Sequence, residues 1–304
     1  MKYVYPDYYE SFKCIKGECR HNCCVGWEID IDESSAERYR ALDGDMGDRM
    51  RNNIDFSATP HFILGKNERC PFLNKDNLCD IITRCGKDSL CEICAEHPRF
   101  HNRFDARTES GLGLCCEAAA RLILGKDAPV RFISDGTVGD ENFILRDKVI
   151  SLLQDRTKSI PDRIDNMLLL CDAQRSQKSL EKWADLLLGF ERLDEKWVEL
   201  LSLLKEKPDL TKFGRYMSGR MAEYEQFLVY LTYRHFIAED ASTIAAFAAL
   251  WYKILYHMGA SLYEKNGQFT FEDQIELARM FSSEIEYSDE NLDIILEELE
   301  FESI

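Results

Sequence analysis

Beyond about residue 125, apolar side chains recur with the helical period of about 3.6 residues. This pattern predicts amphipathic helices at residues 143–153, 161–170, 180–190, 197–204, 217–238, 242–263, 271–284 and 292–299. Pro208 and the turn dipeptide Asn266-Gly267 are typical breaks between such segments. The chain after residue 125 is therefore predicted to be all-helical.

The earlier part of the chain contains short elements of different kinds. Residues 27–31, Trp-Glu-Ile-Asp-Ile, alternate apolar with acidic side chains, which is typical of a half-buried strand. Asp32 or Ser34 is then expected to cap a helix that runs to about Leu42. Residues 74–77, Asn-Lys-Asp-Asn, indicate a tight turn between two short extended pieces.

Cysteine content separates the two parts further. Eleven of the twelve cysteines lie within the first 116 residues. A short, cysteine-dense segment builds only a small core and needs disulfides or a metal to hold it together. We therefore predict a mainly α protein, in which an irregular, cysteine-rich metal-binding part (residues 1–125) packs on an all-helical part (residues 126–304).

The choice between disulfides and a metal depends on the cellular compartment. Residues 1–7 show no basic segment followed by an apolar run, and no stretch approaches the length of a membrane-spanning helix. We therefore expect a cytoplasmic protein, in which thiols stay reduced and clustered cysteines bind metal more often than they form disulfides. Cys171 lies in an apolar helical run and is predicted to be a core residue.

Net charge limits the classes of partner. The formal charge of −17 argues against nucleic acid and against an anionic membrane surface, because both require clustered lysine and arginine. Residues 284–302 carry nine acidic side chains and no basic one. This segment is either a solvated helix face or a docking surface for a lysine-rich partner.

The spacing of the cysteines indicates metal ligands. Cys14, Cys19 and Cys23 are close enough in sequence to converge on one metal or iron–sulfur cluster. A fourth ligand could come from Cys24 or from a distant cysteine: Cys70, Cys79, Cys94 or Cys116. The spacing differs from that of a zinc ribbon, but Cys91, Cys94 and His97 keep a zinc knuckle as an alternative.

Several motifs resemble one known family. The segment Cys14-Ile-Lys-Gly-Glu-Cys19-Arg-His-Asn-Cys23-Cys24-Val-Gly-Trp27 resembles the opening signature of the flagellin lysine-N-methylase family. The elements Cys70-Pro71-Phe72-Leu73 with Leu78-Cys79, Cys94-x3-Pro98-Arg99 and Leu114-Cys115-Cys116-Glu117 are similar to later parts of that signature. A weaker resemblance extends to Tyr230-x2-Tyr233-Arg234-His235-Phe236 and to Phe281-x2-Glu284-x-Glu286.

The resemblance implies an enzyme that transfers a methyl group from S-adenosylmethionine to lysine side chains of flagellin or another protein. It also implies an iron–sulfur cluster of the 4Fe-4S type, with zinc as the alternative metal. The cysteines that match the family motif are Cys14, Cys19, Cys23, Cys24, Cys70, Cys79, Cys94 and Cys116. Because eight cysteines exceed the four that one cubane cluster needs, either a second metal is present or some thiols are structural. Cys85, Cys91 and Cys115 are additional to this set.

The methyl donor has no conventional binding loop in this sequence. Gly111-Leu112-Gly113 is a lone G-x-G, and strands and helices do not alternate as in a doubly wound sheet. We therefore expect the cluster to hold or orient S-adenosylmethionine. The C-x3-C-x2-C spacing of most radical S-adenosylmethionine enzymes is also absent, so radical chemistry is not implied.

Polar residues within and after the predicted helices are the candidate catalytic groups. Tyr233 or His235 is expected to remove a proton from the incoming lysine, unless these residues only tie helices together. Arg99 is the candidate contact for the carboxylate of the cofactor. Glu284 and Glu286 could attract the lysine, although acidic helix ends usually face water.

Two other classes of function compete with the enzyme. In the first, the cysteines hold zinc or iron structurally, and the chain is a non-enzymatic module that recruits a protein partner. In the second, the chain is a thiol redox sensor, which requires one or two exposed cysteines of low pKa rather than many clustered ones. The family resemblance favours the enzyme.

Overall fold

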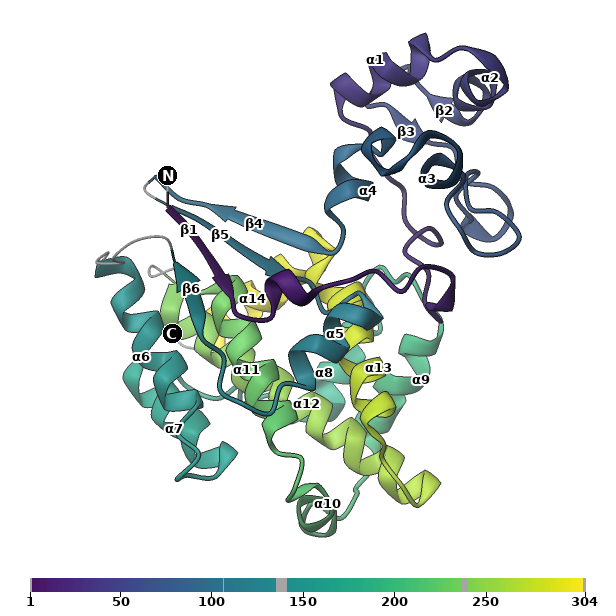
Figure 1. The fold of residues 1–304 in the computed structure, drawn as a ribbon. Helices are drawn as coiled ribbons and strands as arrows, with labels where there is room; N and C mark the ends of the chain where they lie inside the picture. The colour runs from purple at the N-terminus through teal and green to yellow at the C-terminus, as the bar shows by residue number, and fades with distance from the viewer. Residues whose placement is uncertain (1, 106, 135–140, 237–239, 303–304) are drawn as a thin grey trace. The chain divides into compact units, whose positions relative to one another are not determined.

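The structure, a computed structural model, describes residues 2–105, 107–134, 141–236 and 240–302. The chain forms two compact units (Figure 1). The first comprises residues 1–12 and 101–304, and the second comprises residues 13–100. The sequence-based boundary at residue 125 lies inside the first unit, because residues 101–124 supply one complete strand, most of another strand and a helix to it.

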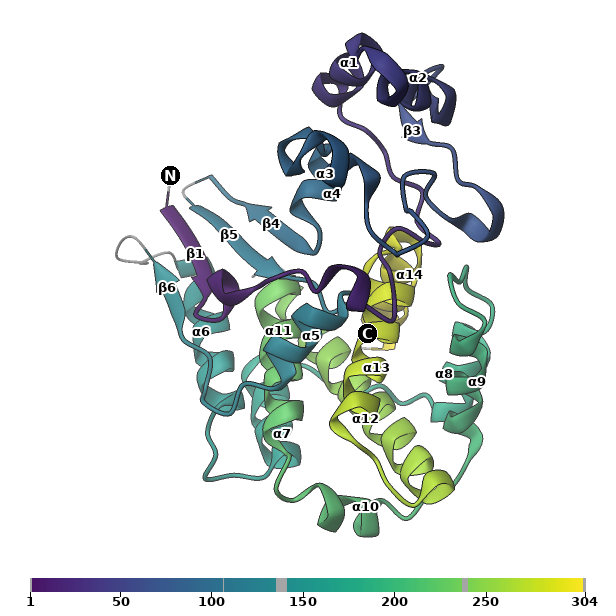
Figure 2. The same cartoon turned by 45° about the vertical axis from the view of Figure 1, so that its right-hand side comes forward.

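The first unit contains a four-stranded sheet that the sequence pattern did not indicate. Its strands are β1 (Lys2–Pro6), β4 (Arg99–Arg103), β5 (Arg107–Leu112) and β6 (Phe132–Ser134), in the order β4-β5-β1-β6 (Figures 1 and 2). Strand β1 pairs in parallel with β5 and antiparallel with β6. All six residues of β5 are buried, although their sequence, Arg-Thr-Glu-Ser-Gly-Leu, is mostly polar. Such a strand has neither the alternation nor the apolar run by which strands are recognised.

Helices make up most of the first unit, so the mainly α prediction is confirmed. They are α5 (Glu117–Leu124), α6 (Glu141–Leu153), α7 (Ile160–Leu170), α8 (Leu180–Leu187), α9 (Lys196–Ser202), α10 (Leu210–Met217), α11 (Ala222–His235), α12 (Ala241–Asn266), α13 (Phe271–Phe281) and α14 (Asp289–Glu302). Single-turn 3-10 helices occur at Tyr9–Ser11 and Leu203–Lys205, and a π-helical turn, η7, spans Ser282–Glu286. None of the described helices is long and apolar enough to cross a membrane.

The eight predicted helices all occur, with shifted ends. Helix α11 begins at Ala222 rather than 217, because the preceding α10 ends at Met217 and a turn separates the two helices. Residues 237 and 238 of that prediction lie outside the described residues. Helix α12 ends at Gly267, whose φ of 72° is the left-handed conformation that glycine adopts readily.

Helix α11 lies at the centre of the first unit. It packs against α5, α6 and α12 (Figure 2). Its residues from Glu223 to Tyr233 are buried. The aromatic side chains of Phe227, Trp251 and Phe281 fill the adjoining core, with the last two rings 4.3 Å apart. A helix surrounded in this way can carry polar groups only if they find partners inside the protein.

The second unit consists of short elements around a small apolar core. These are α1 (Glu33–Ala41), α2 (Gly44–Asn53), β2 (Ile54–Asp55), β3 (His61–Phe62), α3 (Asp80–Cys85), α4 (Glu92–Glu96) and 3-10 turns at Lys16–Glu18, Lys66–Glu68 and Lys87–Ser89. Asp32 caps α1 by accepting from the Ser35 amide at 2.9 Å, which confirms the predicted helix start. A bridge between Leu73 and Cys79 confirms the predicted turn at 74–77.

The prediction of a strand at residues 27–31 is wrong, because these residues form no regular strand. Only Asp30 forms a bridge, to His61, and the Ile29 carbonyl accepts from the Phe62 amide at 3.2 Å. The alternating side chains therefore lie against the two-residue strand β3, which is too short to continue a ladder.

Candidate functional site

Three segments that are far apart in the sequence meet inside the first unit. They are the turn between β5 and α5, the C-terminal half of α11, and the π-helical turn η7 with the residue after it. We call the polar side chains that meet there the buried polar cluster: Cys115, Tyr230, Arg234, His235, Glu286 and Tyr287. Each segment carries part of the family resemblance noted in the sequence.

Glu286 is the central residue of the buried polar cluster. One carboxylate oxygen lies 2.6 Å from Nε2 of His235, and the other accepts from the Tyr230 hydroxyl at 2.8 Å. The Arg234 guanidinium forms an ion pair with the first oxygen at 3.5 Å. The Glu286 side chain is fully buried, whereas those of Arg234 and His235 retain 11% and 12% exposure. The expectation that this acidic residue faces water is therefore wrong.

A π-helical turn places Glu286 in this position. The Tyr287 amide donates to the Ser282 carbonyl at 3.1 Å, the wide spacing that defines such a turn. Glu284, two residues earlier, is also buried and accepts from the Leu193 and Asp194 amides at 2.9 Å each. The two acidic residues of one turn therefore have different tasks: Glu284 fixes a loop, and Glu286 joins the polar cluster.

Tyr230 and Arg234 connect the cluster to the turn before α5. Arg234 Nη1 donates to the Tyr230 hydroxyl at 2.8 Å, and the Leu114 amide donates to the same oxygen at 3.3 Å. Asn102 of β4 donates to the Arg234 carbonyl at 2.9 Å. The Arg234 guanidinium and the Glu286 carboxylate have opposite charges and form an ion pair, so neither charge is buried without a partner.

Gly113 allows this turn to lie directly against Arg234 and Tyr287. A Cβ at Gly113 would stand 2.4 Å from the Tyr287 hydroxyl and 3.2 Å from Arg234 Nη1. The Cys115 thiol is hydrogen-bonded to Tyr287, and burial raises the pKa of Cys115 to about 12 despite that bond and the nearby Arg234. The glycine of the lone G-x-G motif is therefore explained by close packing.

Electrostatics set the charge states of His235 and Glu286. Burial alone would raise the pKa of Glu286, but the Arg234 charge and the His235 hydrogen bond outweigh it and hold that pKa at about 2. Burial lowers the pKa of His235 below its usual 6.5, against the opposing effect of Glu286. At neutral pH the pair is therefore a carboxylate and a neutral imidazole, and a neutral imidazole can accept a proton.

Tyr233, the other predicted proton acceptor, contacts the sheet. Its hydroxyl lies 3.0 Å from the Val4 carbonyl of β1 and 3.1 Å from the Ser110 carbonyl of β5. Its ring stacks on Phe132 of β6 with centroids 4.6 Å apart, and burial raises its pKa well above 10. The residue joins α11 to three strands, and its catalytic role stays a prediction.

In the second unit, six cysteines form what we call the thiol cluster: Cys23, Cys24, Cys70, Cys79, Cys91 and Cys94. Backbone pairing brings three of its segments together, because the Cys70 amide donates to the Cys24 carbonyl at 2.8 Å and Cys79 bridges to Leu73. Helix α4 supplies the remaining two, since Cys91 immediately precedes it and Cys94 lies within it.

The members of the thiol cluster influence one another electrostatically. A hydrogen bond with Cys23, followed by burial and by the charges of Cys70 and Cys79, raises the pKa of Cys24. A hydrogen bond with Cys91, followed by burial, raises the pKa of Cys94. Mutual repulsion of this kind is what a bound cation relieves, because a metal stabilises thiolates.

The remaining candidate residues lie elsewhere. Cys14 accepts from the Lys16 amide at 3.4 Å, and Cys19 donates to the His21 carbonyl at 3.0 Å. Cys116 immediately precedes α5 in the first unit, and Arg99 is the first residue of β4. Cys85 packs beside the core of the second unit, and Cys171 is 6% exposed, as predicted for a core residue.

Cys91 lies outside the eight cysteines of the family motif, although its spacing kept it as a possible zinc ligand with Cys94 and His97. It is 1% exposed and hydrogen-bonded to Cys94, a partner that the C-x2-C spacing already indicated. Within the described ranges, no three cysteine, histidine, aspartate or glutamate side chains converge as the ligands of one metal ion. By its chemistry, the thiol cluster is nevertheless the soft donor set that iron–sulfur clusters and zinc prefer.

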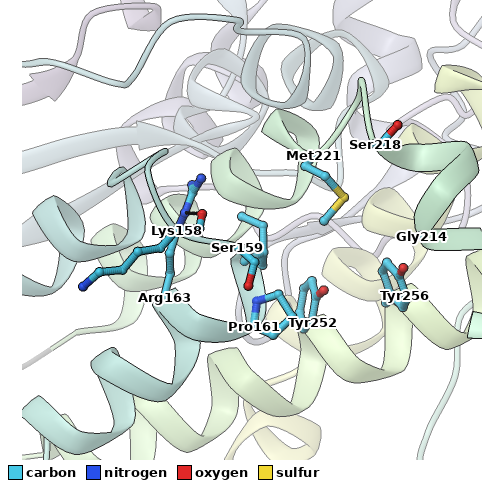
Figure 3. A pocket seen from close by; sticks show the side chains of 10 residues that line it. Lys158, Ser159, Pro161, Arg163, Gly214, Ser218, Met221, Tyr252 and Tyr256 are labelled. Carbon is cyan, nitrogen blue, oxygen red and sulfur yellow. Dashed lines mark hydrogen bonds between the residues drawn. The ribbon is translucent and has the colours of Figure 1, made fainter. Parts of the chain in front are cut away.

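A separate cavity of 350 Å³ lies at the opposite end of α11 from His235. Figure 3 shows Tyr252 and Tyr256 of α12 along one side of it, with Met221 near them. Because α11 has 14 residues, the cavity and His235 are about 20 Å apart along its axis. The cavity lining includes none of the predicted site residues.

The C-terminal part of the chain is similar to a known protein family. Residues 177–304 match the family model described as the FliB lysine N-methylase C-terminal domain. A lysine-N-methylase of Salmonella typhimurium is 27% identical over 153 residues, which cover 45% of this chain and 36% of that protein, and one of Salmonella choleraesuis gives the same values. The flagellar biosynthetic protein FliU of Salmonella muenchen is 25% identical over 162 residues, covering 51% of this chain and 92% of that protein.

The matched region thus spans little more than a third of the two Salmonella methylases. No solved structure matches the chain. The family model includes α11 to α14, and with them Tyr230, Arg234, His235, Glu286 and Tyr287. Five of the six residues of the buried polar cluster therefore lie in the part of the chain that this family shares.

Proposed function

We propose that this chain, whose C-terminal part belongs to the FliB lysine N-methylase family, transfers methyl groups from S-adenosylmethionine to lysine side chains of a protein. The observation that carries the proposal is the position of the His235–Glu286 pair inside the matched family domain. The names of the similar proteins, lysine-N-methylase and flagellar biosynthetic protein, favour flagellin as the substrate.

A base is the first requirement of such a reaction. The lysine ammonium has a pKa of about 10.4 and no lone pair with which to attack a methyl group. A neutral imidazole near pH 7 can remove that proton, and His235 is the neutral imidazole of the buried polar cluster. His235 is accordingly the proposed base.

An iron–sulfur cluster is the proposed metal group, and the thiol cluster is its proposed holder. Five of its six cysteines, Cys23, Cys24, Cys70, Cys79 and Cys94, are among the eight that the family resemblance indicates, and Cys91 is the sixth. When bound, such a cluster can supply an iron that chelates or orients the methyl donor. The soft sulfur donors of these cysteines and the electrostatic coupling among them support this assignment.

The test is methylation of purified flagellin by the anaerobically purified chain with S-adenosylmethionine. We expect mass spectrometry to find methyl groups on surface lysines of flagellin with the iron-loaded chain and none with the metal-free chain. His235→Gln should lose most of the activity, and Cys171→Ala should keep it. An iron-loaded wild-type chain that leaves the flagellin mass unchanged would contradict flagellin methylation.

A further inference from the structure

We propose that Glu286 is a positioning residue that holds the His235 imidazole through Nε2, so that Nδ1 is the atom that accepts the substrate proton. This inference rests on the proposed function and adds the orientation of the base to it. The distance of 2.6 Å between Glu286 and Nε2 is that of a strong, charge-assisted hydrogen bond.

The charge state of Glu286 decides which nitrogen is basic. An ionised carboxylate only accepts hydrogen bonds, so the proton of the Glu286–His235 bond sits on Nε2. A neutral imidazole carries one proton, and its lone pair is then on Nδ1. Among the described residues, the hydrogen bonds of the His235 ring engage Nε2 alone.

Two side chains of α11 hold the Glu286 carboxylate in place. Tyr230 of α11 donates to its second oxygen at 2.8 Å, and Arg234 of the same helix pairs with its first oxygen at 3.5 Å. Tyr287, which follows η7, lies against Arg234 with 4.9 Å between the guanidinium and the ring. Because two donors hold the carboxylate, it cannot turn to follow a displaced imidazole.

The imidazole itself is held by a second contact. The Phe247 ring of α12 meets the His235 ring edge to face, with centroids 5.7 Å apart. Among the residues that the structure describes, the charged or titratable groups that face His235 are Arg234, Glu286 and, behind them, Tyr230, Tyr287 and Cys115. Arg234 opposes protonation of His235, and Glu286 favours it.

The proton and the methyl group can be followed through the reaction. The N–H bond of the lysine ammonium breaks, its proton goes to Nδ1 of His235, and the electron pair stays on the lysine nitrogen. That pair forms a bond to the methyl carbon of the sulfonium donor, while the carbon–sulfur bond breaks and its electrons leave with the thioether. His235 then releases its proton to water. Glu286 remains ionised throughout and stabilises the imidazolium.

The first measurement reads the imidazole directly, by nitrogen NMR of the histidine-labelled wild-type chain. We expect His235 to carry its proton on Nε2 and its lone pair on Nδ1 at neutral pH. Glu286→Gln should lower the pKa of His235 and mix the two tautomers. Glu284→Gln is the matched control, because Glu284 is buried on the same π-helical turn and contacts backbone amides of another loop. It should leave the His235 signals unchanged.

The second measurement is the pH dependence of flagellin methylation. Glu286→Gln should lower kcat about tenfold or more with little change in KM, and should move the acidic limb of the profile to lower pH. Glu286→Asp keeps the negative charge, so the acidic limb of its profile should lie between those of Glu286→Gln and the wild type. A wild-type His235 protonated on Nδ1, or a Glu286→Gln profile identical to that of the wild type, would overturn the inference. A wild-type chain with the expected tautomer and no methyl transfer would instead overturn the proposed function and, with it, the role of Glu286.

Discussion

Gly113 has no Cβ atom, and this lets its backbone pack directly against the buried polar cluster. The backbone at this position approaches the Tyr287 hydroxyl and the Arg234 guanidinium so closely that no side chain fits. In the sequence, the same glycine belongs to a G-x-G that could be read as a weak nucleotide loop. Only the contact with residues more than a hundred positions away reveals its packing role.

Gly113→Ala is expected to destabilise the chain by about 1–3 kcal/mol, because the new Cβ forces Tyr287 or Arg234 to move. Urea unfolding measures this change. Gly219→Ala is the matched control, since nothing lies within 4 Å of a Cβ there and the unfolded chain becomes less flexible. Equal stability of the two variants would show that the turn before α5 adapts without cost.

The pKa values of His235 and Glu286 predict loss of stability in acid. The pKa of His235 is lowered on folding, so the unfolded chain takes up the proton first and stability falls as pH drops below 6.5. The pKa of Glu286 falls from 4.5 to about 2, so its contribution is complete above 4.5 and is lost as pH falls toward 2. Urea unfolding at a series of pH values should show both losses. Below pH 4.5, the free energy of unfolding of Glu286→Gln should change less with pH than that of the wild type. Parallel plots of unfolding free energy against pH for the two proteins would contradict this assignment.

At the scale of elements, helix α13 and the turn η7 deliver Glu286 to its site. Thr270 and Asp273 form a capping box at the start of α13, with the Thr270 side chain 3.2 Å from the Asp273 amide. The π-helical turn then ends the helix and directs Glu284 and Glu286 to different partners. Turns of this kind are frequent at functional sites.

Thr270→Ala is expected to cost about 1 kcal/mol of stability, because the Asp273 amide loses the Thr270 hydroxyl oxygen that caps it. Thermal unfolding measures the change. Thr211→Ala is a suitable control, as Thr211 is exposed in the first turn of α10 and caps nothing. The His235 tautomer should be the same in both variants, since the cap is more than two helical turns from η7. A changed tautomer in Thr270→Ala would show that the cap also orients Glu286.

At the scale of the whole molecule, the thiol cluster and the buried polar cluster belong to separate compact units. The second unit has a small core around Phe62 and Phe72, with cysteines packed beside it. We predict that a bound metal stabilises this unit, because metal binding couples to folding where the apolar core is small. The thiol cluster should therefore decide both the metal content and the folding of the second unit.

Metal analysis of the anaerobically purified chain is expected to give about four iron and four sulfide per molecule. Cys91→Ala should lose most of the iron, because Cys91 is the buried partner of Cys94. Cys171→Ala should retain the iron at a cost of about 1–2 kcal/mol, which is typical of a small core truncation. Full iron in Cys91→Ala would remove this residue from the ligand set. Stoichiometric zinc without sulfide would favour a non-enzymatic metal-binding module.

The sequence by itself predicted eight helices of the first unit and indicated metal-ligand chemistry for the cysteines. Helices such as α12 and α13 were predictable because their apolar residues follow a local period, and their ends carry glycine or a capping box. The C-x2-C spacing of Cys91 and Cys94 likewise specifies proximity within one turn of chain. Motif resemblance was equally local, since it depends on the order of residues and not on their neighbours in space.

Only the tertiary structure decided which polar residues act together. Strand β5 is polar and fully buried, so its place beside β1 follows from pairing with distant segments and not from its own pattern. Glu286 and His235 are 51 positions apart, and nothing in either segment encodes their contact. Buried polar groups require partners, and the folded chain supplies those partners from whichever elements pack together. The sequence therefore indicated the candidate residues, and packing joined His235 to Glu286.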